Sequence, residues 1–366
     1  MVKLCNCKWD ELLYKTRGKH LFCFGSGEIA KWLSKDIFGQ NIAEHIEAFV
    51  DNDLQKVNSS IKLDGIEIPI ISYMDFVKNK ANNSVMLVTS MYYNEIINQM
   101  DHEVALSDME CYVAVFLEEE KITVTKKELF CGKTEKIPKK IHYCWFGGKD
   151  IPSIYKSYIE SWKKYCPDYE IICWNEDNYD YKRINYTKEA YEAGKWAFVS
   201  DYARLDIIYN HGGIYLDVDV QVVKNLDLLL RNSMFCGFEK GNYVNTGVGF
   251  GAVAGFSELR KMKDLYCKIP FKRKDGTLNL TACTNYQTNY LVQNGLKRNG
   301  KLQVVNGIRV YPRTVLAPTD FYDISDYKSP ETYAIHHYAA SWFADDNSKS
   351  RLLKSNIQIK NRMEIR

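Results

Sequence analysis

Two aspartates, Asp217 and Asp219, lie one residue apart in the apolar run "GGIYLDVDVQ". Like charges this close repel each other, and a buried carboxylate is costly without a partner. Residues 214–221 have the composition of a strand, in which alternate side chains share a face, so both carboxylates are expected on one face beside Tyr215. Oxygen ligands in this arrangement suit a hard divalent cation, Mg²⁺ or Mn²⁺. An edge strand with a solvated acidic face is the alternative, and the apolar and aromatic flanks disfavour it.

The segment before these acids adds two more charged residues. Asp201 and Arg204 are three residues apart in a helical pattern, so they share one face of the predicted helix. This helix is expected to end at Gly212 and Gly213, which suit a C-terminal cap and lead directly into the acidic strand. An isolated Asp–Arg pair on a helix is most often a surface salt bridge. Beside the acidic strand, the same pair is expected to point into a shared site.

These residues belong to the second of two regions that the chain of 366 residues predicts. Short apolar strands at 20–24, 45–53, 84–90 and 111–117 alternate with helical patterns. This alternation predicts an α/β domain with a parallel sheet over residues 1–120. The charged, poorly periodic residues 121–136 are the expected linker, and residues 137–366 are the expected second domain.

The first domain carries a glycine loop. Gly25-Ser26-Gly27-Glu28-Ile29-Ala30 follows the first strand and is expected to open a helix, and Asp51 ends the next strand. This is a GxGxxA form of the dinucleotide-binding pattern, in which glycines let the backbone approach a phosphate. The pattern predicts a small Rossmann-like domain. A tight strand-to-helix turn without a ligand is the alternative to a bound nucleotide.

Composition narrows the classes of function. The formal net charge is +3, so a nucleic-acid partner is not implied. The eleven cysteines form no CxxC pair, which favours free thiols in a reducing cytoplasm. No apolar run reaches membrane-spanning length, and the N-terminal residues lack the apolar core of a signal peptide. The expected location is therefore cytoplasmic, with any contact to the inner membrane being peripheral.

The motifs "IPKKIHYCWFGG" (137–148) and "FVSDYARLDIIYNHGGIYLDVDV" (198–220) together resemble the DxD-containing sugar-transferase family 32, which includes bacterial capsular polysaccharide enzymes. They are also similar to the catalytic domain of the large clostridial glucosylating toxins. The resemblance covers roughly residues 137–345. It implies a GT-A fold, an α/β domain around a mostly parallel sheet, preceded here by the Rossmann-like domain.

The resemblance also implies an activity. The chain is expected to be a metal-dependent retaining hexosyltransferase that uses Mn²⁺ or Mg²⁺. The donor would be a UDP-sugar, UDP-glucose or UDP-galactose, and the acceptor a growing surface or capsular polysaccharide or a lipid-linked glycan. A toxin-like transferase that modifies a protein and a nucleotide-sugar-binding regulator that uses the glycine loop are the alternatives. The oligomeric state stays open.

Site residues carry over by position in the matched motifs. The implied donor contacts are Tyr143, Trp145, Asn175, Ser200, Asp201, Arg204, Tyr215, Asp217 and Trp342. The implied catalytic set is Asp201, Arg204, Asp217, Asp219 and Asn245. Trp145 would stack on the uracil ring, Asn245 would lie near the donor sugar, and the Trp342 indole N–H would donate to the diphosphate. Asp219 is the firmer metal ligand, and Asp217 would divide its contacts between metal and sugar.

The C-terminal motif "IHHYAASWF" (335–343) supplies the third expected metal ligand. His337 resembles the histidine that completes the metal shell in some related GT-A enzymes, and His336 is the alternative one residue away. Downstream of the DxD motif, family members often have a Gly-Pro pair where this chain has "TACTNYQTNYL". Contacts to sugar or acceptor by Thr284, Asn285 and Gln287 are therefore not carried over. No second carboxylate can be placed across the sugar, which favours a same-face substitution.

Overall fold

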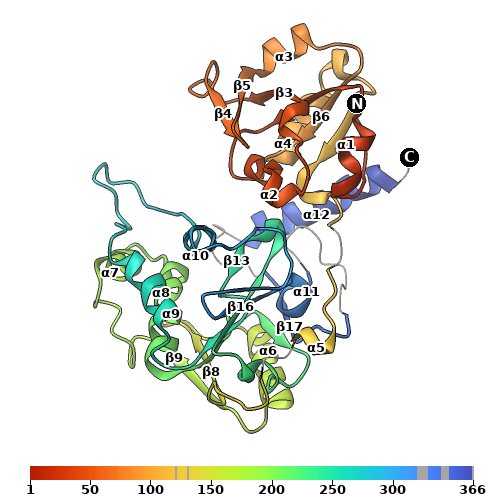
Figure 1. Cartoon of the computed structure of the whole chain (residues 1–366). Coiled ribbons are helices and arrows are strands. Elements are labelled where there is room, and N and C mark those ends of the chain that lie inside the picture. Colours follow the sequence, from red (N-terminus) through yellow and green to blue (C-terminus); the bar gives the residue numbers. More distant parts are fainter. Residues whose placement is uncertain (120–121, 130–131, 320–328, 339–345, 365–366) are drawn as a thin grey trace. The chain divides into compact units, whose positions relative to one another are not determined.

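The computed structural model describes residues 1–119, 122–129, 132–319, 329–338 and 346–364 (Figure 1). The chain forms two compact units. Unit 1 comprises Met1–Lys121 together with Asp345–Arg366, and unit 2 comprises Ile122–Ala344. Unit 2 is therefore inserted, along the chain, between the main part of unit 1 and its C-terminal helix.

Unit 1 is built on a mainly parallel sheet. The strands are β1 (Lys3–Leu4), β2 (His20–Phe24), β3 (Ile46–Asp51), β4 (Ser60–Leu63), β5 (Ile66–Ser72), β6 (Ser84–Val88) and β7 (Glu110–Val113). In the described part of the unit their order is β1-β7-β6-β2-β3-β5-β4, and only the β4–β5 pair is antiparallel. In the inner order β5-β3-β2-β6-β7, the strands after β2 are first added on one side of it and then, from β6 on, on its other side, as in a Rossmann-like sheet. The predicted α/β class is confirmed for this unit.

The helices of unit 1 include a long C-terminal one. They are α1 (Leu12–Lys15), α2 (Lys35–Phe38), α3 (Tyr73–Asn79), α4 (Tyr93–Asp101) and α12 (Asp346–Glu364). Helix α12 is fixed by a bidentate pair in which Arg362 donates to both Asp101 oxygens, at 2.8 and 3.1 Å, and by the buried Ile359. The tail, which the sequence interpretation kept with residues 137–366, thus has its contacts in unit 1.

Unit 2 contains a mixed sheet. Its strands are β8 (Lys140–Cys144), β9 (Glu170–Trp174), β10 (Gly213–Tyr215), β11 (Val220–Val222), β12 (Met234–Phe238), β13 (Val244–Asn245), β14 (Phe250–Ala252), β15 (Gln303–Val305), β16 (Ile308–Tyr311) and β17 (Ala334–His336). Among the described residues the order is β15-β16-β12-β14-β10-β8-β9, with β13 beside β12. Strands β9, β8 and β10 are parallel to one another. Strand β14 lies between β10 and β12 and is antiparallel to both. Strands β11 and β17 form a separate antiparallel pair.

Helices cover this sheet, and one of them runs through the core. They are α5 (Lys126–Leu129), α6 (Ser153–Tyr165), α7 (Asn185–Glu192), α8 (Trp196–His211), α9 (Ser257–Tyr266), α10 (Cys283–Gln293) and α11 (Arg313–Leu316). Most of the middle of α8 is buried, from Phe198 to Ile208. It ends at Gly212, as predicted, and the positive φ of Gly212 and Gly213 turns the chain into β10.

Two local predictions are wrong. The expected continuous strand 214–221 is two strands, β10 and β11, which belong to different sheets and are joined by a turn that contains both acids. The helix expected after the glycine loop is a 3-10 segment, Ile29–Leu33, followed by the four-residue α2. Extended backbone at Ser34 separates these two pieces, so no long helix begins at the loop.

Candidate active site

The two acids of the DxD motif are brought together by a turn. The carbonyl of Asp217 accepts a hydrogen bond from the Val220 N–H at 3.0 Å, which closes the turn between β10 and β11. The Asp217 N–H donates to the Gly247 carbonyl at 3.1 Å, which ties the turn to the segment after β13. Strand alternation therefore does not explain why the two carboxylates are neighbours, because both lie in this turn and not in a strand.

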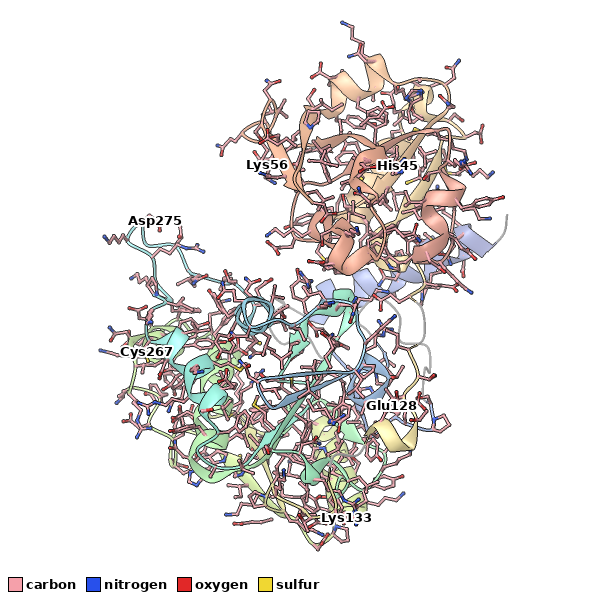
Figure 2. All side chains as sticks on the ribbon, in the orientation of Figure 1. His45, Lys56, Glu128, Lys133, Cys267 and Asp275 are labelled. Atoms are coloured by element: carbon pink, nitrogen blue, oxygen red, sulfur yellow. The ribbon has the colours of Figure 1, made fainter. Side chains whose placement is uncertain are left out.

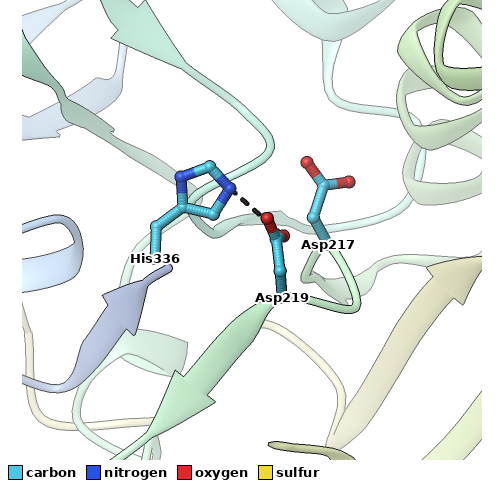
Figure 3. Close-up of side chains that lie close together, drawn as sticks. All are labelled: Asp217, Asp219 and His336. Carbon is cyan, nitrogen blue, oxygen red and sulfur yellow. Dashed lines mark ion pairs between the residues drawn. The ribbon is translucent and has the colours of Figure 1, made fainter. Parts of the chain in front are cut away.

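His336 completes a cluster with these acids. Strand β17 pairs with β11 in a register that places His336 opposite Val220, next to Asp219. The His336 Nε2 atom lies 3.2 Å from Asp219 Oδ1, as drawn in Figure 3, and the two side chains are almost fully buried. One ligand atom from each of Asp217, Asp219 and His336 lies within 4.8 Å of the others.

Neighbouring carboxylates oppose the effect of burial on His336. Burial, the largest single influence, lowers the pKa of the imidazole, but the Asp219 charge, the hydrogen bond to Asp219 and the charges of Asp217 and Glu239 together raise it. The other ring nitrogen, Nδ1, is buried without a hydrogen-bond partner in the described part of the chain. These residues fit a hard divalent cation: two carboxylates and an imidazole converge, and a cation would neutralise the adjacent acids.

His337, the expected metal ligand, points elsewhere. Its ring stacks on Tyr158 of α6, with centroids 4.4 Å apart and planes 6° apart, and its Nε2 contacts Gln221 Oε1 at 3.2 Å. Successive side chains of a strand leave on opposite faces. The β11–β17 pairing therefore gives the inward position to His336 and leaves His337 exposed. The structure thus places the alternative histidine, not the first choice, beside the acids.

A buried ion network adjoins the cluster. Arg204 Nη2 lies 3.0 Å from Asp201 Oδ1 and 3.3 Å from Asp217 Oδ1, and the Arg204 side chain is 5% exposed. The Tyr215 hydroxyl donates to the same Asp217 oxygen at 3.0 Å. Arg204 also lies over the Tyr215 ring, 5.1 Å from its centroid. The helix pair is therefore not a surface salt bridge, and it links α8 directly to the DxD turn.

Burial sets the protonation of this network. It raises the pKa of Asp201 to about 6, with Arg204 opposing the shift and the Asp217 charge adding to it. Burial alone would lower the pKa of Arg204, but the neighbouring Asp217 and Asp201 carboxylates raise it well above its ordinary value. Arg204 is therefore a fixed cation next to the acids.

Asn245 is held in one orientation by two partners. Its Oδ1 accepts from the Gly247 N–H at 2.6 Å, and its Nδ2 donates to Glu239 Oε2 at 2.7 Å. Gly247 in turn lies against Asp217: a Cβ added to Gly247 would meet Asp217 Oδ2 at 2.2 Å. Hydrogen bonds therefore run from Glu239 through Asn245 and Gly247 to the DxD turn.

Sequence reasoning missed Glu239 and Cys283. Glu239 follows β12 in an ordinary "GFEKG" context, so nothing local indicates a site role. Cys283 begins α10, and its Sγ accepts from Arg204 Nη1 at 3.8 Å. Gln287, one turn further along α10, is buried and donates to Thr246 Oγ1 at 2.8 Å. Helix α10 thus holds both Arg204 and the segment that carries Asn245.

The other expected donor contacts lie at the ends of β8 and β9 or on α8. Trp145 is partly exposed after β8, with its ring centroid 6.1 Å from that of Tyr155, and its indole N–H donates to the Lys149 carbonyl. Tyr143 packs edge-on against Trp162, and Asn175 Oδ1 accepts from the Asp177 N–H within its own turn. The Ser200 hydroxyl donates to the Trp196 carbonyl. Trp342 lies outside the described residues.

The glycine loop of unit 1 has a different environment. Asp51 Oδ2 accepts from the Ser26 N–H at 3.0 Å and from the Ser26 hydroxyl at 2.5 Å, and Asp51 Oδ1 accepts from the Asp53 N–H at 3.0 Å. A Cβ at Gly25 would meet Ser90 Cβ and the Thr89 carbonyl at 2.8 Å. These contacts hold the loop in a tight turn between β2 and the 3-10 segment Ile29–Leu33.

Comparison with known proteins indicates the enzyme class of the chain. A family model described as a glycosyltransferase sugar-binding region containing a DXD motif matches residues 152–236, which include Asp201, Arg204, Asp217 and Asp219. An uncharacterised glycosyltransferase of Acanthamoeba polyphaga mimivirus is 27% identical over 215 residues, 56% of this chain and 84% of the relative. These matches confirm the predicted enzyme class, a glycosyltransferase.

Two further relatives match over shorter stretches. Inositol phosphoceramide mannosyltransferases 1 and 3 of Schizosaccharomyces pombe are each 30% identical, over 28% and 30% of this chain. The chain spans only 34% and 31% of their lengths. The solved structure of the PaToxG glycosyltransferase is 21% identical with a TM-score of 0.36, and the match covers 43% of this chain and 69% of that one.

Among the described residues, no helix is both long enough and apolar enough to cross a bilayer.

Proposed function

We propose that unit 2 is a metal-dependent retaining hexosyltransferase that uses a UDP-sugar, UDP-glucose or UDP-galactose, as donor. The acceptor is a bacterial capsular or surface polysaccharide or a lipid-linked glycan, reached at the cytoplasmic face of the membrane. The observation that carries the proposal is the convergence of Asp217, Asp219 and His336 within 4.8 Å, beside the buried cation of Arg204. The matched DXD family supports the use of a nucleotide sugar.

Asp217, Asp219 and His336 would hold Mn²⁺ or Mg²⁺ by two carboxylates and one imidazole nitrogen. A divalent cation there supplies Lewis-acid stabilisation of the negative charge on the leaving diphosphate. Preference for a hard cation follows from the carboxylate oxygens, and the imidazole extends the range to Mn²⁺.

The chain's own residues prepare the donor. Arg204 is a cation fixed by Asp201 and Asp217, so it offers positive charge to the diphosphate without rearrangement. The Asn245 amide is oriented by Glu239 and Gly247 before the sugar binds. Trp145, partly exposed beyond the end of β8, is proposed to stack on the uracil ring.

The proposed chemistry is a same-face substitution. The bond between the anomeric carbon and the diphosphate oxygen breaks, and its electron pair stays with the diphosphate. The acceptor oxygen bonds to the same face of that carbon, and its proton passes to the leaving phosphate. Glu239 is a carboxylate in this neighbourhood, and its hydrogen bond from Asn245 supports a role in orienting the amide.

The test is donor binding and turnover with and without metal. A bound ligand stabilises the fold in proportion to its affinity, so UDP-sugars should raise the unfolding temperature in the presence of Mn²⁺ and less in its absence. Asp219→Asn should remove both the metal effect and donor hydrolysis. Asp168→Asn, which changes an exposed acid paired with Lys139, is the control and should change neither. Metal-independent turnover by the Asp219 variant would contradict the proposal.

A mannosyl donor is the second candidate. Two of the matched relatives are inositol phosphoceramide mannosyltransferases, whose names give mannose as the sugar and a lipid as the acceptor. The same thermal screen decides between the donors when a nucleotide-activated mannose is included beside UDP-glucose and UDP-galactose.

A further inference from the structure

A basic loop projects from unit 2 between α9 and α10. We call residues 268–281 the basic loop; Figure 1 shows the segment extending away from the helices, and Figure 2 labels Asp275 at its outer end. Residues 268–275 read "KIPFKRKD", which is four cations and one carboxylate, a local net charge of +3. All five of these charged residues are exposed.

Three of the cations are available to a partner. Within the described part of the chain, no carboxylate pairs with the ammonium groups of Lys268, Lys272 or Lys274. Arg273 is used differently, because its guanidinium donates to the Leu278 carbonyl at 3.0 Å and to Asn279 Oδ1 at 3.3 Å. The arginine therefore stabilises the loop, while the lysines present unpaired charge to solvent.

The loop has a defined structure. Lys272 and Leu278 form an antiparallel bridge, and the Arg273 N–H donates to the Thr277 carbonyl at 2.8 Å. At the base, the Lys272 N–H donates to Glu189 Oε2 of α7 at 2.8 Å, and Phe271 is fully buried. Lysines on a loop held in this way lose less conformational entropy on binding a partner than lysines on a disordered segment would.

An exposed apolar residue accompanies the charges. Leu280 is 54% exposed in the chain that returns from the loop to α10. Cations next to an exposed leucine form the pattern of a segment that lies at a lipid–water interface, where the charges meet headgroups and the apolar side chain enters the boundary region.

The loop also leads into the candidate active site. Asn279 donates to the Tyr286 hydroxyl of α10 at 2.9 Å and to the Pro270 carbonyl at 3.3 Å, which fixes the base of the loop to that helix. Cys283, four residues after Asn279, contacts Arg204. A surface bound by the loop would therefore be held at a set place relative to the donor site of unit 2.

We propose that the basic loop docks unit 2 on an anionic phospholipid surface through Lys268, Lys272 and Lys274. The proposal rests on the proposed function in one respect: a lipid-linked acceptor would be presented at that surface. An anionic membrane fits the observations better than a soluble polyanion does, because Leu280 adds apolar surface that a hydrated polyanion would not use.

The experiment is vesicle co-sedimentation with the full chain. Vesicles of phosphatidylcholine alone are compared with an equal mixture of phosphatidylcholine and phosphatidylglycerol at low salt. Each lysine near an anionic leaflet is worth about fivefold in partitioning, so the double variant Lys272→Glu/Lys274→Glu should bind about 25-fold more weakly or worse. The matched control is Lys297→Glu/Lys301→Glu, which makes the same charge change at two other exposed lysines of unit 2 and should bind like the wild type.

Three outcomes would overturn the docking proposal. The wild type could bind both vesicle types equally, or the two double variants could lose binding equally, which would indicate a general charge effect. Single-stranded DNA could bind as tightly as the anionic vesicles in the same buffer, which would assign the loop to soluble polyanions. Metal-dependent donor hydrolysis, measured on the same samples, reports separately on the proposed function and should be unchanged in both double variants.

Discussion

Asp51 of unit 1, which ends β3 beside the glycine loop, and the acids of the DxD turn of unit 2, which follow β10, have different surroundings. Asp51 accepts hydrogen bonds from the Ser26 N–H and hydroxyl and from the Asp53 N–H, and the half-exposed Lys56 lies 3.4 Å from it. Burial raises its pKa, but these hydrogen bonds outweigh burial and the net pKa is lowered. Asp217 and Asp219 instead lie beside two almost fully buried side chains, Arg204 and His336.

This difference separates a structural acid from a candidate ligand. A carboxylate whose oxygens are satisfied by local N–H and hydroxyl groups has little left to offer a ligand. Two carboxylates that face each other and an imidazole favour the binding of a cation, since the cation reduces the repulsion between the two carboxylates. The comparison therefore predicts that equivalent changes in the two regions have unequal effects on function.

The largest effect is expected for the removal of one acid in each region. Asp219→Ala should lower metal-dependent donor hydrolysis by about 100-fold or more, because electrostatic stabilisation of the leaving group is lost. Asp51→Ala should leave the rate per folded molecule within about twofold, since the partners of Asp51 in the described residues, Ser26, Asp53 and Lys56, all belong to unit 1. Initial rates at saturating Mn²⁺ measure both. A comparable loss in the Asp51 variant would remove the distinction between the regions.

The next effect concerns the two adjacent histidines. His336→Ala should weaken Mn²⁺ binding by at least about tenfold, because it removes the imidazole that faces the acids. His337→Ala should leave the metal affinity unchanged, since its ring stacks on Tyr158. Calorimetric titration of Mn²⁺ into each variant gives the affinities directly. A larger loss of Mn²⁺ affinity in the His337 variant than in the His336 variant would support His337, the metal ligand expected from the sequence.

A matched pair of glycine substitutions sharpens the comparison further. Gly247→Ala should destabilise the fold by about 1–3 kcal/mol and weaken metal binding, because the new Cβ would meet Asp217 Oδ2 at 2.2 Å. Gly27→Ala should be tolerated, since a Cβ there meets no atom within 4 Å among the described residues. Urea unfolding measures the free energies. A Gly27 variant as damaged as the Gly247 variant would show that the glycine loop is under a constraint that its contacts do not reveal.

The smallest effect is a pH dependence of stability from Asp201. Its pKa is raised to about 6 in the folded chain from an ordinary 3.8, so the folded state binds this proton more tightly. The resulting stabilisation is complete below pH 3.8 and is lost as the pH rises through about 6. Relative to Asp201→Asn, the wild type should therefore become less stable over this range in metal-free urea unfolding. A pH-independent difference between the two proteins would contradict the assigned pKa.

The sequence predicted the α/β class, a Rossmann-like first domain and the end of α8 at Gly212, because these depend on the alternation of strand and helix patterns, on the glycine pattern and on capping. The helix expected after the glycine loop was wrong, since Ser34 adopts extended backbone that no local pattern signalled. The contacts of α12 with unit 1 depend on Arg362 and Asp101, which are 261 residues apart in the chain. Such pairings are not visible in a single sequence without its fold.

At the candidate site, residue types and spacing by themselves singled out Asp201, Arg204, Asp217 and Asp219, because acids in an apolar run need neutralising partners. Which partners they meet was decided by the tertiary structure. The register of β11 on β17 selects His336 over His337, and the turn that closes at Val220 replaces the expected strand. Glu239 and Cys283 enter the site through β12 and α10, which approach the DxD turn only when the chain is folded. The hydrogen-bond register between distant strands, and the side chains that it brings together, are set by how the whole chain packs. The residue pattern of a single segment does not determine them.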